Sequence, residues 1–180
     1  MGAGDQGEAA DHVEQLYALP VADEVLEVEG HRGVLQGEHV DVDEDRAREL
    51  YVRAARQGSA KAQYVVATMY RFAQYGMPKD IAKAVDFYLK AADQGMPTAQ
   101  FALGKMLMEG KGVAQDDAEA RRWFERAAQS QHPDAAYNLA LMYDKGIGAT
   151  QSFELAEKWY RAAAKQGISD AEVGLGLMAY

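Results

Sequence analysis

Residues 116–128 read DDAEARRWFERAA, and residues 152–164, which lie 36 positions further on, read SFELAEKWYRAAA. Both stretches carry an alanine, an aromatic couple and a final alanine pair at the same places. Two further copies precede them, DIAKAVDFYLKAA at residues 80–92 and DEDRARELYVRAA at residues 43–55. The alanine pairs therefore recur at spacings of 37, 36 and 36 residues, and a fixed period of this length indicates a helical repeat protein.

The residues of each copy predict one amphipathic helix. Their alanine and aromatic positions are spaced by three, four and seven residues, as on one face of a helix. Each copy opens with a residue whose side-chain oxygen can accept a hydrogen bond from the free amides of the first turn: Asp43, Asp80, Asp116 and Ser152. Glycine follows three of the alanine pairs, where a left-handed residue would end the helix: Gly58, Gly95 and Gly167, with Gln131 in the remaining copy.

A second apolar segment follows each copy, as in AAYNLALMYDK at residues 135–145. It alternates small residues with larger ones, and small side chains at a helix crossing let two backbones approach closely. Pro97 and Pro133 suit the first turn of this second helix, where a missing amide hydrogen costs nothing. The sequence therefore predicts an all-α fold, an α-α superhelix (solenoid) of antiparallel helix pairs with about 36 residues per repeat.

These residues also resemble a known family. Residues 135–148, AAYNLALMYDKGIG, followed by Ala156, Trp159-Tyr160 and Ala163-Ala164, are similar to the Sel-one-like repeat, a relative of the tetratricopeptide repeat. The likeness covers roughly residues 36 to 180, and it departs from the family pattern at residues 73–76, where Gly-x-Gly is expected and one extra residue lengthens the loop. The resemblance implies a right-handed superhelix with a concave groove, in proteins that scaffold or regulate other proteins.

The repeat phase suggests a division of the chain. We expect an acidic leader over residues 1–22, in part disordered, and a solenoid over residues 23–180. Residues 23–42 are predicted to form a degenerate capping unit, because they lack the alanine and tyrosine frame. Residues 168–180 would be an incomplete last repeat, whose final helix exposes an apolar side and could serve self-association.

Charge and composition narrow the range of partners. The net charge is −9, and residues 1–45 hold 13 Asp or Glu against one Arg, which leaves 15 acidic and 18 basic residues in the rest of the chain. Without clustered Lys and Arg, nucleic acid and anionic membranes are unfavourable partners. No apolar run is long enough for membrane insertion. The compartment stays open: cytoplasmic as written, or periplasmic or secreted if a signal peptide has been removed.

No residues predict catalysis, a cofactor or a metal. The chain has no Cys, and His31 and His39, with Asp41 and Asp43 nearby, match no compact metal-ligand spacing. Glycines such as Gly110 follow helices and lack the strand and Lys-Ser/Thr pair of a phosphate loop, so they are interpreted as turn residues. The methionine column is interpreted as core: Met69, Met106, Met142 and Met178. We therefore expect no enzyme activity.

Columns of the second helices that vary between repeats are the candidate binding surface, because the frame residues are committed to stacking. The residues predicted to line a groove for an extended or helical partner segment are Tyr64, Arg71, Phe101, Lys105, Tyr137 and Asn138. Arg71 and Lys105 would favour an acidic segment. The same face could instead pack against the adjacent repeat.

The favoured function is a protein-protein interaction scaffold or adaptor. The alternative is a regulatory or inhibitory (immunity-type) protein dedicated to one partner, and a hydrolase is a distant third. The acidic leader could also occupy the groove, in which case its removal would raise the affinity for a partner.

Overall fold

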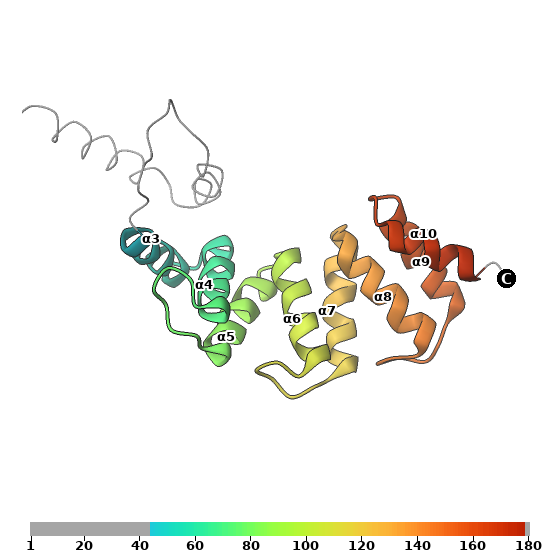
Figure 1. Cartoon of the computed structure of the whole chain (residues 1–180), viewed down its shortest axis with the longest axis horizontal. Helices are drawn as coiled ribbons and strands as arrows, with labels where there is room; N and C mark the ends of the chain where they lie inside the picture. Colours follow the sequence, from blue (N-terminus) through green and yellow to red (C-terminus); the bar gives the residue numbers. More distant parts are fainter. Residues whose placement is uncertain (1–43, 179–180) are drawn as a thin grey trace, which may run out of the picture.

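The computed structural model describes residues 44–178; residues 1–43 and 179–180 lie outside the described part. The described part contains eight α-helices and no strand, which confirms the predicted all-α repeat fold. The helices follow one another in a curved row of antiparallel pairs (Figure 1). They are α3 Glu44–Arg56, α4 Ala60–Phe72, α5 Ile81–Asp93, α6 Pro97–Glu109, α7 Asp117–Gln129, α8 Pro133–Lys145, α9 Phe153–Ala164 and α10 Ser169–Met178. The odd-numbered ones are here called first helices and the even-numbered ones second helices.

Helix starts agree with the sequence prediction. Asp80 Oδ1 accepts a hydrogen bond from the amide of Lys83 at 3.0 Å. Asp116 and Ser152 cap α7 and α9 in the same way. Pro97 and Pro133 are the first residues of α6 and α8, as expected. Each repeat thus has its start fixed by its own sequence; Asp43, the predicted cap of α3, lies outside the described residues.

The turn after α4 has a strained backbone where its sequence departs from the family pattern. Gly110 and Gly146 end α6 and α8 in the left-handed conformation, with φ of 65° and 68°. Ala73 occupies the corresponding place after α4 with a φ of 55°. A residue with a Cβ atom is strained there by about 1–2 kcal/mol, a cost that glycine avoids.

The core runs along the row of helices and is built mainly from alanine, methionine and aromatic side chains. One cluster joins Ala67 of α4, Tyr88 of α5 and Met106 of α6, so that three successive helices share it. Met69, Met106 and Met142 are completely or almost completely buried, which confirms their assignment to the core. The most extensive contacts join helices adjacent in the chain, as expected of a solenoid.

Two buried glutamines reinforce successive hairpins. Gln63 and Gln100 occupy equivalent positions on α4 and α6, and each donates a hydrogen bond to a backbone carbonyl of the preceding first helix. The side-chain oxygen of Gln63 accepts a second bond from Gln94 Nε2 at 2.7 Å. The oxygen of Gln100 has no partner within residues 44–178, because Ser130 stands where Gln94 stands one repeat earlier.

Close helix contact depends on small residues, as the sequence predicted. A Cβ atom added to Gly104 of α6 would lie 2.8 Å from Phe124 of α7 and 3.2 Å from the carbonyl oxygen of Ala120. Gly176 of α10 is the equivalent residue two repeats later, and nothing lies within 4 Å of an added Cβ there. The side of α10 on which another first helix would stack is therefore open in the described part of the chain.

Several predictions fall on residues that the structure does not describe. The acidic leader of residues 1–22, the capping unit of residues 23–42 and the region of His31 and His39 all lie there. The proposed division of the chain stays a prediction. Among the helices of residues 44–178, none has the length and apolar character needed to cross a membrane.

Candidate interaction surface

The candidate surface consists of side chains that the second helices turn toward the following repeat, and it is here called the second-helix face. Its predicted residues are Tyr64 and Arg71 of α4, Phe101 and Lys105 of α6, and Tyr137 and Asn138 of α8. Its aromatic residues lie over aromatic rings of the first helices. The ring centroids are 5.5 Å apart in the pair Tyr64–Tyr88 and 5.8 Å apart in the pair Phe101–Phe124. Tyr137 and Tyr160 form the third such pair, at 6.0 Å.

These aromatic pairs pack adjacent repeats against each other, which is one of the two roles that the sequence left open. Tyr88, Phe124 and Tyr160 are buried at 0–2% exposure, while Tyr64, Phe101 and Tyr137 are only half-buried. The outer ring of each pair therefore joins adjacent repeats and also leaves part of its surface available to a ligand. Their role in binding stays a prediction.

The predicted cation Lys105 and the neighbouring Lys111 both approach the carboxylate of Glu109. Lys111 Nζ lies 2.7 Å from Glu109 Oε2, and Lys105 Nζ lies 4.0 Å from Glu109 Oε1. The hydrogen bond from Lys111 lowers the pKa of Glu109 despite its partial burial, and the charges of Lys105 and Arg71 lower it further. Lys105 and Lys111 thus share one anion at the end of α6, the charge of Arg71 on α4 also acts on it, and the group keeps a positive excess.

Asn138 has a more local role than its neighbours. Its side chain donates a hydrogen bond to the carbonyl oxygen of Asp134 at 2.7 Å, within α8. Lys105 Nζ, by contrast, lies 5.9 Å from the centroid of the Phe101 ring, within cation-π range. Among the predicted residues, Lys105 and Phe101 thus interact with each other, whereas Asn138 bonds within its own helix.

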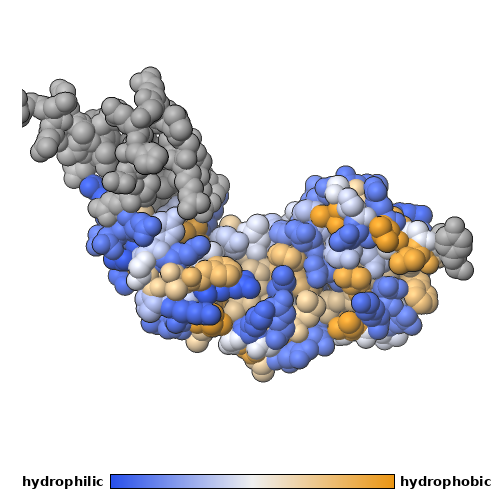
Figure 2. Space-filling view, in the orientation of Figure 1, coloured by the Kyte–Doolittle hydropathy of each residue, from blue (hydrophilic) through white to orange (hydrophobic). Residues whose placement is uncertain are grey.

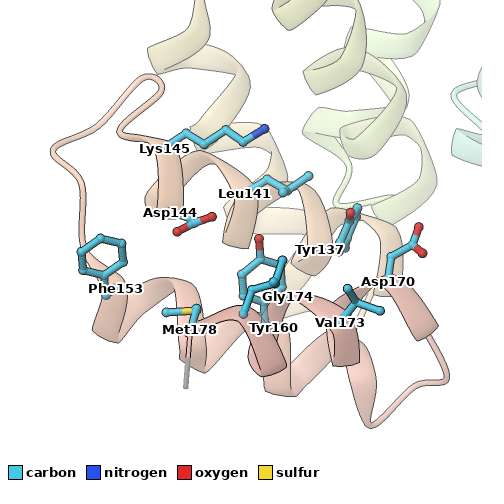
Figure 3. Close-up of a pocket in the computed structure, with 11 residues that line it drawn as sticks. Tyr137, Leu141, Asp144, Lys145, Phe153, Tyr160, Asp170, Val173, Gly174 and Met178 are labelled. Carbon is cyan, nitrogen blue, oxygen red and sulfur yellow. The ribbon is translucent and has the colours of Figure 1, made fainter. Parts of the chain in front are cut away.

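A pocket farther along the same face is lined by Tyr137, one of the predicted residues, and by others that the sequence analysis did not propose as a site, Lys145 among them. It lies between α8 and α10 with Tyr160 of α9 at its floor, and its volume is about 670 Å³ (Figure 3). Leu141 stands on the α8 side, and Val173 and Leu177 stand on the α10 side with 62% and 76% exposure. Val173 replaces the aromatic residue that this column holds in the three earlier second helices, which is why the pocket opens here.

Acidic groups flank this pocket. Figure 3 shows Asp144 toward one end, Asp170 toward the other and Tyr160 between them. Burial and the nearby Asp144 carboxylate raise the pKa of Tyr160 to about 12, so the phenol stays protonated and can donate a hydrogen bond to Asp144. In the space-filling view, hydrophobic patches gather over the α10 end of the row, whereas the α3 end is mainly hydrophilic (Figure 2).

The titratable groups of the described part indicate packing and capping roles. Burial lowers the pKa of His132, which caps α8 by accepting the amide of Ala135 at Nδ1 and stacks on Phe101 with 4.7 Å between ring centroids. No group of three His, Asp or Glu side chains within residues 44–178 is placed to hold a metal ion. The face therefore offers side chains suited to recognition of another molecule.

A row of antiparallel helix pairs in register with a 36-residue period defines an α-helical repeat protein, and its neighbour-to-neighbour contacts define a solenoid. The chain belongs to the Sel1 repeat family, whose repeat model matches residues 32–59, 60–96, 97–132 and 133–168. Sel1 repeats commonly mediate protein-protein interaction. This confirms the family indicated by the sequence.

Solved structures agree with this assignment. A protective antigen of uropathogenic Escherichia coli with an SLR fold is 37% identical, with a TM-score of 0.78 over 87% of this chain and 33% of the antigen. A Sel1 repeat protein from Oxalobacter formigenes is 32% identical, with a TM-score of 0.70 over 74% of this chain and 54% of that protein. Cysteine rich protein B of Helicobacter pylori, at 21% identity and a TM-score of 0.56, shares the fold over 75% of this chain and 96% of its own.

The chain spans about a third of the length of the first of these proteins and about half of the second. The comparison with curated proteins gave no significant match.

Proposed function

We propose that the chain is an interaction scaffold or adaptor that holds an acidic segment of a partner protein on its second-helix face. The observation that carries the proposal is that Lys105 and Lys111 lie 4.0 and 2.7 Å from the carboxylate of Glu109, on which the charge of Arg71 also acts. The excess of positive charge in this group attracts a carboxylate-bearing segment. The half-buried rings of Tyr64 and Phe101 provide an apolar surface beside it.

The scaffold is well suited to this task because the frame and the face use different residues. Alanine pairs, methionines and the inner aromatic rings are buried and hold the helices in place. The charged residues of the face are surface-accessible, so they can be exchanged without loss of the core; Lys105 has 41% side-chain exposure. A preformed face of this kind loses little conformational entropy when it binds.

The test is capture of a partner from the native source by the wild-type chain and by the double variant Arg71→Glu/Lys105→Glu. We expect the variant to retain its helical circular dichroism and to lose at least about tenfold in affinity for the captured protein, because two favourable charge pairs become repulsive. The matched control reverses two exposed cations at the ends of first helices, Arg56→Glu/Lys165→Glu, and should bind normally.

Equal capture by both double variants would refute the proposed surface. The stoichiometry of the captured complex is also informative. Several partners that compete for one face are expected of a scaffold, whereas one tightly bound partner at a fixed ratio would indicate a dedicated inhibitory protein instead.

A further inference from the structure

The second-helix face carries two chemically different regions, and together they specify more than an acidic ligand. The region between α4 and α6 holds Arg71, Lys105 and Lys111 with one carboxylate. The pocket between α8 and α10 is lined mainly by apolar and aromatic side chains and carries two carboxylates, Asp144 and Asp170, against one cation, Lys145. Neither of these two aspartates forms an ion pair with another residue of the described part.

Resting on the function proposed above, we propose that the face binds a partner segment with a fixed order of side chains: acidic residues over α4 and α6, then an apolar side chain flanked by Lys or Arg in the pocket between α8 and α10. The apolar side chain would displace water from Leu141, Val173 and Leu177, and the flanking cation would pair with Asp144 or Asp170. The two ends of the face then recognise opposite charges, which sets the direction of the bound segment.

The pocket has the features of an anchor site. Its volume of about 670 Å³ is within the range that holds a large side chain together with part of its backbone. Its floor is fixed, because an added Cβ at Gly174 would lie only 2.8 Å from Tyr160, so that α10 and α9 are already in close contact there. Its exposed apolar walls gain from being covered, and buried apolar anchors dominate the affinity of most interfaces.

The distance between the regions limits the length of the segment. Packed helices lie about 8–10 Å apart, so neighbouring second helices, which share a first helix between them, are separated by at most ~20 Å. The two regions are two such intervals apart, and an extended chain advances about 3.3 Å per residue, so the segment spans roughly 12 residues or fewer. A peptide of ordinary length can therefore reach both regions.

Charge argues for an external partner over the chain's own N-terminal segment. Residues 1–45 contain 13 acidic residues and a single Arg, so they suit the cationic region but supply almost nothing for Asp144 and Asp170. A second copy of the chain is an alternative occupant that the sedimentation experiment below distinguishes. The two-part complementarity is met only by a segment that carries both charges in order.

The probe is a random 16-residue peptide library displayed on phage and selected on the full-length chain, after which enriched peptides are synthesised and titrated. We expect an acidic half and an apolar half with Lys or Arg. Val173→Lys, which places a cation at the exposed wall of the pocket, should weaken binding about tenfold, and so should Arg71→Glu/Lys105→Glu. Leu89→Lys changes a partly exposed leucine on α5 and should leave the affinity unchanged within about twofold.

The outcomes separate the two proposals. If no peptide is enriched, or if Arg71→Glu/Lys105→Glu binds as well as wild type, the function proposed above fails and this inference fails with it. If that variant loses binding but Val173→Lys does not, only the inference is overturned. Equal affinity of a peptide whose halves are exchanged would overturn the fixed direction. A dimer seen by sedimentation and abolished by Val173→Lys would assign the pocket to a second copy instead.

Discussion

The contact between Gly104 and Phe124 allows the packing of this solenoid to be tested with one added methyl group. In Gly104→Ala the new Cβ would meet two ring carbons of Phe124, at 2.8 and 2.9 Å, and the carbonyl oxygen of Ala120 at 3.2 Å. The ring is completely buried and the carbonyl belongs to the backbone of α7, so neither can move freely. Gly176→Ala makes the same change in the same column where nothing lies within 4 Å.

The expected magnitudes follow from these surroundings. Replacing glycine by alanine inside a helix raises the free energy of unfolding by about 0.5–1 kcal/mol when the site is open. Gly176→Ala should raise it by up to that amount. Overpacking a rigid core costs about 1–3 kcal/mol, so Gly104→Ala should be less stable than wild type by ~0–2.5 kcal/mol. Because the helix term is common to both variants, their difference of about 1–3 kcal/mol reports the contact itself.

The assay is equilibrium unfolding in urea, followed by circular dichroism and by tryptophan fluorescence, which comes from Trp123 on α7, next to Phe124 in the chain, and from Trp159 on α9. Combining Gly104→Ala with Phe124→Leu should recover part of the loss, giving a coupling free energy of at least ~0.5 kcal/mol in a double-mutant cycle. If Gly104→Ala proved as stable as Gly176→Ala, the close approach of α6 to α7 would not be limited by this pair and the reasoning would be wrong.

Three further changes test other parts of the structure by the same unfolding measurement. Ala73→Gly should stabilise by about 0.5–1 kcal/mol, because the relief of left-handed strain exceeds the added entropy of the unfolded chain; a loss would contradict the strain. Ser130→Gln should raise the free energy of unfolding by roughly 1 kcal/mol, because the new side chain can donate a hydrogen bond to the unpartnered oxygen of Gln100, as Gln94 does to Gln63. An unchanged free energy would mean that the two side chains do not meet. Burial lowers the pKa of His132, so the unfolded chain binds more protons than the folded chain once the pH falls below about 6.5. The free energy of unfolding should therefore fall from pH 8 to pH 5, and it should fall less for His132→Asn.

Much of the fold could be predicted because each rule acts within one repeat. The caps Asp80, Asp116 and Ser152 and the first-turn prolines depend on residues three or four positions away, and the period multiplies each observation. The sequence shows that residues 73–76 depart from Gly-x-Gly, but it does not show that Ala73 adopts the left-handed conformation. Local sequence patterns that recur at a fixed period are the easiest to recognise in a sequence.

The candidate surface was predictable only in part. Arg71 and Lys105 could be assigned to one face from their columns, and the structure places both around Glu109. Of the residues that line the pocket, only Tyr137 was among those predicted, because the floor residue Tyr160 belongs to the repeated frame and was interpreted as a packing residue. Phe153 and Asp170 lie at helix starts, outside the variable columns, so no periodic argument selects them.

The same periodicity that fixes the fold also explains where a ligand can be recognised. Every second helix is held against its neighbours by buried alanines and by an inner aromatic ring, so these columns cannot change without loss of the stack. Variation therefore falls on the remaining columns of the second helices, which turn toward the following repeat, and their side chains recur at nearly constant separations along the row. In the proposed function, a ligand that spans several repeats would meet a series of different side chains, from Arg71 to Asp144, and the order of those side chains would set the specificity of binding.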